Sequence, residues 1–250
     1  MIDIQLIKPI HRSIIILAIG FLLVGFTSCN QTHGELHLIS ANENKGFNFP
    51  YFLFIPEEGL DTTQITIIIE PNNTGFPSDN FDDHMNAAKQ QASGSQIGNF
   101  LSHKLNYPLV VPVFPRPLAN WKIYTHALDR DALLQEGNAI ERLDKQLIAI
   151  FNDAKMKFTQ MGYEVGDTFI MTGFSACASF ANRFAIIHPH KVKAYVAGGL
   201  NGMLVLPVRQ VAGISLPYPI GVSDLYDLTG QQFDLASFQN IPQFGLMVIL

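Results

Sequence analysis

A short apolar segment that runs directly into a serine is the feature that most constrains this chain. Residues 168–175 read Thr-Phe-Ile-Met-Thr-Gly-Phe-Ser, and the residues that follow, up to Ile187, have the composition of a helix. A serine at such a strand-to-helix turn needs small residues two positions away on either side, because the backbone folds back on itself there. Gly173 and Cys177 occupy these positions. The sequence therefore predicts a nucleophile elbow with Ser175 at its apex.

The motif departs from Gly-x-Ser-x-Gly at its last position, where Cys177 replaces the second glycine. Serine is also a common helix-capping residue, so a purely structural role for Ser175 is the alternative. Cys177 is itself a second candidate nucleophile, because a helix amino end lowers the pKa of a thiol. A residue two positions past the apex points back into the helix packing, however, and we expect Cys177 to be a buried apolar filler.

The histidine that would activate such a serine is not evident. In proteins with this elbow, the acid and the histidine follow the serine in the chain, and no histidine follows His190. At about 1.5 Å per helical residue, His188 and His190 lie on the order of 18 to 20 Å from Ser175, beyond hydrogen-bond reach. The sequence also ends in an apolar run, residues 244–250. We expect a domain that lacks its last strands and helix, interrupted before its acid and histidine.

The composition favours a single domain and argues against binding of nucleic acid or metal ions. A chain of 250 residues with 48% hydrophobic and 15% charged residues suits one sizeable globular domain. The 16 Lys and Arg residues are scattered singly and the net charge is -5. The sequence therefore lacks the clustered basic residues that bind nucleic-acid phosphates. No His, Asp, Glu or Cys pattern has metal-ligand spacing. We expect a monomer with no metal and no cofactor.

The amino terminus has the pattern of a targeting segment. A positive flank at residues 8–12 precedes an apolar run, 14–26, which is too short for a comfortable membrane span. The run ends in Phe-Thr-Ser-Cys, which resembles a bacterial lipoprotein signal with Cys29 as the lipidated first residue. We expect a signal peptide at 1–28, a tether at 29–35, and an extracytoplasmic, membrane-anchored protein. Ordinary secretion and an uncleaved anchor are the alternatives.

The rest of the chain alternates between strand and helix patterns, which predicts an α/β domain over 36–250. Such an order implies a mostly parallel sheet with helices on both faces and function at the carboxyl ends of the strands. The loop-rich segment 201–239, which contains Pro207, Pro217 and Pro219, looks like a lid-like insertion. Strands are expected at 36–40, 51–55, 65–70, 109–114 and 193–197, and helices within 82–106 and at 138–161.

The loop after the strand at 65–70 is a candidate for binding a developing anion. In proteins with a nucleophile elbow, a backbone amide from this loop joins the amide of the residue after the nucleophile. Here the amides would belong to Ala176 and to either Asn73 or Thr74. An ordinary Asn-rich turn is the alternative.

Aromatic and polar residues after the strand at 109–114 are candidates for a pocket wall. Trp121 and Tyr124 offer aromatic surfaces, and His126 precedes the charged run 129–131. Clusters of this kind more often form a structural ion pair beside a histidine whose hydrogen bonds are satisfied.

Several of these segments together resemble a family of bacterial α/β-hydrolase lipoproteins related to polyhydroxybutyrate depolymerases and esterases. The resemblance covers about residues 36–244 and implies an α/β-hydrolase fold, a Ser-acid-His triad, and a small or polymeric carboxylic ester as substrate, with no cofactor. A catalytically inactive relative that binds a polymer or glycan and a serine peptidase are the alternatives. The segments that carry the resemblance are residues 70–75, 112–117, 124–131, 173–176 and 188–189.

Overall fold

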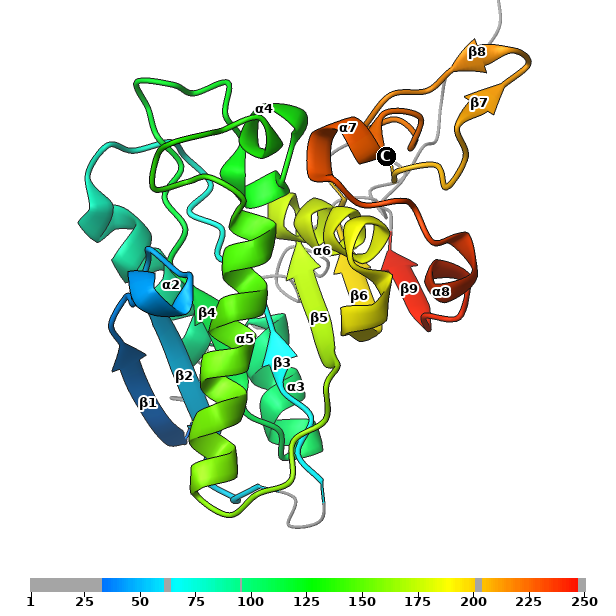
Figure 1. The fold of residues 1–250 in the computed structure, drawn as a ribbon. Coiled ribbons are helices and arrows are strands. Elements are labelled where there is room, and N and C mark those ends of the chain that lie inside the picture. The colour runs from blue at the N-terminus through cyan, green and yellow to red at the C-terminus, as the bar shows by residue number, and fades with distance from the viewer. Residues whose placement is uncertain (1–32, 61–63, 95, 201–203, 247–250) are drawn as a thin grey trace, which may run out of the picture. The chain divides into compact units, whose positions relative to one another are not determined.

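A seven-stranded sheet forms the centre of the domain (Figure 1). The computed structural model describes residues 33–60, 64–94, 96–200 and 204–246, so the predicted signal segment and Cys29 lie outside the described residues. The strand order is β1-β2-β4-β3-β5-β6-β9, antiparallel from β1 to β4 and parallel from there on. The strands are β1 Gly34–Ile39, β2 Tyr51–Pro56, β3 Ile68–Ile69, β4 Leu109–Pro112, β5 Phe169–Phe174, β6 Val192–Gly198 and β9 Gln243–Leu246.

Helices cover both faces of this sheet, because strand side chains alternate between the faces and both sets are apolar. One set packs with α5 Leu143–Gln160 and α6 Ala176–Ile187, and the other with α2 Phe81–Ser93 and α3 Ile97–Leu105. Within the described ranges, no helix is both long and apolar enough to cross a bilayer. The short elements are η1 Glu43–Lys45, η2 Thr125–Ala127, α4 Arg130–Leu133, η3 Pro189–Lys191, β7 Gln210–Val211, β8 Ile214–Ser215, α7 Leu225–Thr229 and α8 Leu235–Gln239.

The predicted order of elements is confirmed, whereas several boundaries are wrong. The helix predicted at 138–161 begins only at Leu143, because Arg142 has a left-handed backbone with φ 48°. The helical region 82–106 is two helices separated at Gly94. The predicted strand at 65–70 pairs as a ladder only at β3, although its isoleucines are fully buried.

The segment 201–239 is anchored in the core over part of its length. Tyr218, Val222 and Leu225 are buried, and the Tyr218 hydroxyl donates to the Leu128 carbonyl. A 2.5 Å ion pair joins Arg130 to Asp224 in the same region. The β7–β8 hairpin instead projects from the domain (Figure 1). Its apolar residues Val211 and Ile214 are exposed. Its role as a lid stays a prediction.

His188, one of the two histidines that follow Ser175, belongs to a buried ion cluster. Its Nε2 lies 2.7 Å from Asp144 Oδ2, and Arg142 donates two hydrogen bonds to the same carboxylate. Burial raises the pKa of Asp144, but the hydrogen bonds from Arg142 and His188 outweigh it and hold that pKa below its ordinary value. This cluster ties the start of α5 to the end of α6, so His188 has a structural partner.

Candidate active site

Ser175 occupies the sharp turn between β5 and α6. Its backbone has φ 62° and ψ -120°, a region that costs a residue other than glycine about 1–3 kcal/mol and is concentrated at functional sites. The Ser175 amide donates to the Gly198 carbonyl at 2.9 Å, which fixes the turn to β6. The side chain is partly exposed. The local geometry is therefore that of the elbow expected from the sequence.

The two small neighbours of Ser175 explain how the turn closes. A Cβ atom at position 173 would lie 2.6 Å from the carbonyl carbon of Cys177, so only glycine fits there. The Cys177 thiol lies within the turn, where it accepts from the Phe174 amide at 3.1 Å and donates to the Phe174 carbonyl at 3.0 Å. The side chain is 2% exposed, and burial raises the pKa of this thiol. Cys177 thus braces the elbow, and its placement matches the expected buried filler.

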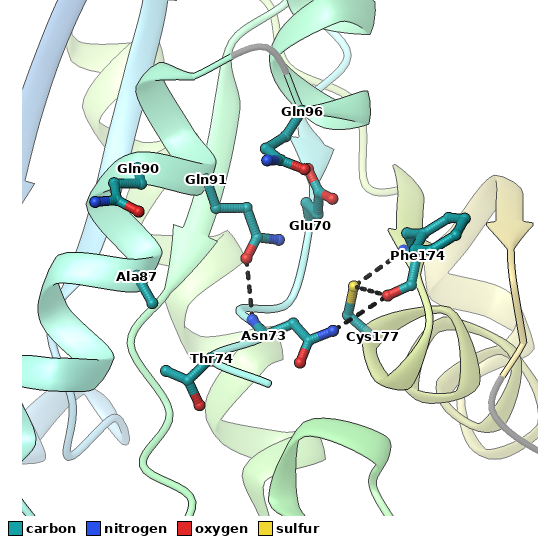
Figure 2. Close-up of a pocket in the computed structure, with 9 residues that line it drawn as sticks. All are labelled: Glu70, Asn73, Thr74, Ala87, Gln90, Gln91, Gln96, Phe174 and Cys177. Carbon is teal, nitrogen blue, oxygen red and sulfur yellow. Dashed lines mark hydrogen bonds between the residues drawn. The ribbon is translucent and has the colours of Figure 1, made fainter. Parts of the chain in front are cut away.

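The loop after β3 lies directly against this elbow. Gln91, from α2, accepts from the Asn73 amide at 3.0 Å and donates to the Pro71 carbonyl at 2.9 Å. The Asn73 side chain in turn donates to the Phe174 carbonyl at 3.3 Å (Figure 2). The two segments that the sequence predicts to cooperate are thus hydrogen-bonded to each other, and the loop has a side-chain clamp in Gln91.

The same contacts show which of the two candidate loop amides, Asn73 or Thr74, is free to bind an anion. The Asn73 N–H is already engaged by Gln91, whereas no hydrogen bond joins the Thr74 N–H to another described residue. Ala176 is the first residue of α6, where amides have no partner within the helix. Thr74 and Ala176 are therefore the amides that remain available to an anion.

Asn72 and His126 fix the base of the loop. The Asn72 side chain accepts from the Phe114 amide and donates to the Phe114 carbonyl, both at 2.9 Å. His126 Nε2 lies 2.8 Å from the same carbonyl. His126 is 1% exposed, and burial lowers its pKa to about 3, so the ring is neutral at physiological pH. Its place is therefore in the support of the loop.

The three residues proposed from sequence as pocket walls do not meet at the elbow cavity. Trp121 is 62% exposed. Tyr124 stacks on the Arg116 guanidinium, whose carbon lies 3.7 Å from the ring centroid. Neither residue lines the cavity described below, and His126 is enclosed among loop contacts. These three residues are close to one another along the chain, and that closeness was the only basis for placing them in one pocket wall.

No histidine in the described part of the chain is hydrogen-bonded to Ser175. His84 Nε2 lies 2.9 Å from the Ser78 carbonyl, and His126 and His188 have the partners given above. Ser175 Oγ makes no hydrogen bond with another described residue. The contacts of these residues therefore do not identify a general base.

A cavity of about 250 Å³ lies between the loop, α2, α3 and the elbow (Figure 2). Glu70, at the end of the buried β3 run, is 2% exposed, and its Oε2 accepts from the Gly98 amide at 2.8 Å. Burial raises the pKa of Glu70 to about 7. No metal-ligating cluster occurs among the described residues. The cavity is lined by Glu70, Asn73, Thr74, Ala87, Gln90, Gln91, Gln96, Phe174 and Cys177.

Sequence reasoning missed Glu70 and Gln91. One signal was present for Glu70, because a charged residue directly ends a run of four isoleucines and a threonine. No local signal marked Gln91, which lies in a polar stretch of α2 next to the equally polar Gln90. Its importance comes only from the tertiary contact with the loop.

Strand order, helices on both faces and a serine at the β5–α6 turn together define the α/β-hydrolase fold. Among solved structures, poly(aspartic acid) hydrolase-1 from Sphingomonas sp. KT-1 superposes with a TM-score of 0.54 at 15% identity, covering 87% of this chain and 72% of that one. An arylesterase gives a TM-score of 0.47 at 12% identity over 94% and 83% of the two chains. An acetyl xylan esterase from Aspergillus awamori gives 0.45 at 16% identity over 72% and 58%. The chain matches no protein-family model and no curated protein. At 15% identity, the likeness to the first of these structures shows the fold alone.

Proposed function

We propose that this protein is a serine hydrolase of carboxylic esters, with Ser175 as its nucleophile. The observation that carries the proposal is the backbone of Ser175, held at φ 62° in a turn that admits only glycine at position 173. A fold maintains such a strained residue where its side chain must be presented at a fixed place. The fold likeness to a poly(aspartic acid) hydrolase supports the broader class of hydrolases by analogy.

In the proposed reaction, Ser175 Oγ attacks the ester carbonyl carbon while a histidine takes the hydroxyl proton. The oxygen of the tetrahedral intermediate is held by the N–H groups of Ala176 and Thr74, and Asn73 contributes by positioning the loop. Each such donor is worth about 3 kcal/mol in the transition state. The alcohol then leaves with the proton, and water hydrolyses the acyl-enzyme. No histidine among the described residues is hydrogen-bonded to Ser175, and neither the triad histidine nor its acid is assigned to a residue.

Labelling with a fluorophosphonate probe tests the proposal. An activated serine displaces fluoride and forms a Ser Oγ–phosphorus bond, which adds the probe mass to one peptide. We expect the adduct on the peptide that contains Ser175, at a rate that falls after denaturation. A folded protein that remains unlabelled at Ser175 would rule out the hydrolase.

A catalytically inactive relative that binds a polymer or glycan in the retained cleft is the second candidate function. The specific observation in its favour is that no described histidine contacts Ser175. It predicts retention of the protein on an immobilised polymer together with no labelling of Ser175. The proposed hydrolase predicts labelling.

The Gln91 clamp should matter to the rate of the reaction. The substitution Gln91→Met keeps the side-chain length but removes the bonds to Asn73 and Pro71, so the loop amides lose their fixed position. We expect kcat to fall about tenfold with KM nearly unchanged, the result of losing an interaction used in the transition state. Steady-state hydrolysis of 4-nitrophenyl acetate measures both constants, and the labelling rate provides a second readout.

Gln160, the exposed last residue of α5, supplies the matched control for this experiment. It does not line the cavity beside the elbow. Gln160→Met makes the same change of side chain away from the loop, and we expect it to leave kcat within about twofold of the original, since surface substitutions of this kind usually have small effects. Equal losses in the two variants would refute the positioning role of Gln91.

We also propose that the protein is lipid-anchored through Cys29 at the bacterial cell envelope and acts there on small or polymeric esters. The support is the sequence pattern of residues 8–29, which lie outside the described residues. Dual-signal anchoring through acyl chains gives stable membrane attachment. The substitution Cys29→Ser should move the protein from the membrane fraction to the soluble fraction. An unchanged distribution would contradict lipidation.

A further inference from the structure

The cavity beside the elbow contains a buried carboxyl group with no basic partner. Glu70 is 2% exposed, yet none of the residues that line the cavity is a lysine, arginine or histidine. Buried carboxylates are normally paired with a cation, because removing a lone charge from water costs several kcal/mol. The described residues that line the cavity therefore supply no counter-charge to this buried carboxyl group.

The groups that face Glu70 leave acceptor capacity free. The Gly98 amide donates to Oε2 at 2.8 Å, and the Gln91 amide and the Cys177 thiol are its other neighbours. A carboxylate has about four lone-pair sites, so two donors do not saturate it. A Cβ atom at position 98 would collide with Glu70 Oε2, so the glycine there makes room for the carboxylate.

The cavity lies beside the loop after β3 and the elbow, where a substrate of the proposed hydrolase would bind. Asn73 and Thr74 of the anion-binding loop form one side, and Phe174, the residue before the nucleophile, forms another (Figure 2). The volume of about 250 Å³ is just below the usual range of ligand pockets, about 300–1,000 Å³, and so suits a small group or a short chain. The side chain of Gln96 adds a carboxamide oxygen that can accept a hydrogen bond, as the carboxamide oxygens of Gln91 and Asn73 do.

We infer that this cavity is a subsite for a primary ammonium group, bound by the Glu70 carboxylate and neighbouring carboxamide oxygens. The group belongs either to the substrate of the ester hydrolase, which would make that substrate an amino-ester, or to a free alkylamine. The substrate assignment rests on the proposed function, whereas ammonium binding does not. A carboxylate with carboxamide oxygens provides the acceptors that the three N–H groups of an ammonium require.

The affinity of the proposed subsite for an ammonium group should increase with pH. Without a ligand, burial raises the pKa of Glu70 to about 7, and Cys177, the other titratable group at the cavity, stays protonated because burial raises its pKa too. An ammonium group favours the ionised carboxylate and lowers the pKa of Glu70. Affinity should therefore rise as pH increases through 7 and fall at lower pH, where Glu70 takes up a proton.

Ligand-observed NMR titration of the full chain tests ammonium binding without any need for turnover. The probe is n-butylammonium, and n-butanol is the uncharged comparison. We expect the amine to bind and the alcohol to bind at least about tenfold more weakly, as expected for a hydrogen bond to a charged group. Glu70→Gln, which keeps an acceptor for Gly98, should weaken amine binding at least about tenfold and abolish its pH dependence.

An exposed carboxylate provides the matched control. Glu164→Gln removes the same charge from the surface, and it should leave amine binding unchanged. Thermal melting of each variant identifies any loss of fold, and the pH titration of the unmodified protein provides a readout that needs no variant. Equal binding of amine and alcohol, or a Glu70→Gln variant that binds the amine as well as the original, would overturn the proposal.

A second arm distinguishes the two sources of the ammonium group. The rates of hydrolysis of 4-nitrophenyl 6-aminohexanoate and 4-nitrophenyl hexanoate are compared for the original protein and for Glu70→Gln. A preference for the amino-ester that disappears in the variant assigns the subsite to the substrate. Amine binding without such a preference assigns it to a free amine. If neither ester is hydrolysed, the proposed function fails, and the NMR titration still decides the subsite.

Discussion

Ser175→Ala is expected to reduce ester hydrolysis at least about 10³-fold in kcat and to eliminate fluorophosphonate labelling, because the attacking oxygen is removed. The loss cannot be attributed to the turn, since alanine and serine are equally strained at φ 62°. The free energy of unfolding should therefore change by less than about 1 kcal/mol. Hydrolysis of 4-nitrophenyl esters and a urea titration measure the two quantities.

Ser179, one helical turn after Ser175, is the control for this experiment. It is a buried serine on the same helix. Ser179→Ala should retain labelling and most of the activity, because its hydroxyl is not at the apex of the turn. Labelling that persists in Ser175→Ala, at another serine or at Cys177, would refute the assignment of the nucleophile.

Gly173→Ala is expected to cost about 3 kcal/mol of folding free energy and to abolish activity, because the added methyl group has no room. Its Cβ would lie 2.6 Å from the Cys177 carbonyl carbon and 2.8 Å from the Ala178 nitrogen. These are backbone atoms of α6, which cannot rotate away as a side chain would. The collision can be relieved only by moving α6 relative to β5, and this displaces Ser175. Urea unfolding monitored by circular dichroism measures the loss.

The matched control is Gly166→Ala, which lies three residues before the start of β5. No atom lies within 4 Å of a Cβ built there, and its φ is outside the left-handed region. This substitution should change stability by less than about 1 kcal/mol. A Gly173→Ala variant as stable as Gly166→Ala would show that the elbow is looser than its geometry indicates.

The fold was largely predictable because its signals are local and repeated. Apolar runs such as residues 169–171 form buried strands, and the three- and four-residue spacing of apolar side chains in 143–158 predicts a helix that covers them. The boundaries were less predictable. Arg142 delays the start of α5 and Gly94 ends α2, in both cases through the backbone conformation, which side-chain periodicity does not encode.

The candidate site was predictable to different degrees. Ser175, Gly173 and the loop 71–75 could be found because each lies in a short segment whose spacing follows from the geometry of the turn. His126 is of a residue type that is common in active sites, but in the structure it is buried against Phe114 and Asn72. Nothing along the chain distinguished it from a pocket residue, because burial depends on elements distant in sequence.

By itself, the sequence determined the alternation of strands and helices, the tight turn at Ser175 and the small residue that the turn demands, since these depend on neighbours along the chain. Only the tertiary structure decided that Gln91 from α2 holds the loop after β3, that the Asn73 amide is already engaged, and that Glu70 faces a cavity without a basic partner. These properties arise from the packing of α2, α3 and β3 against the elbow, and hydrogen-bond partners separated by tens of residues leave no periodic pattern in a sequence.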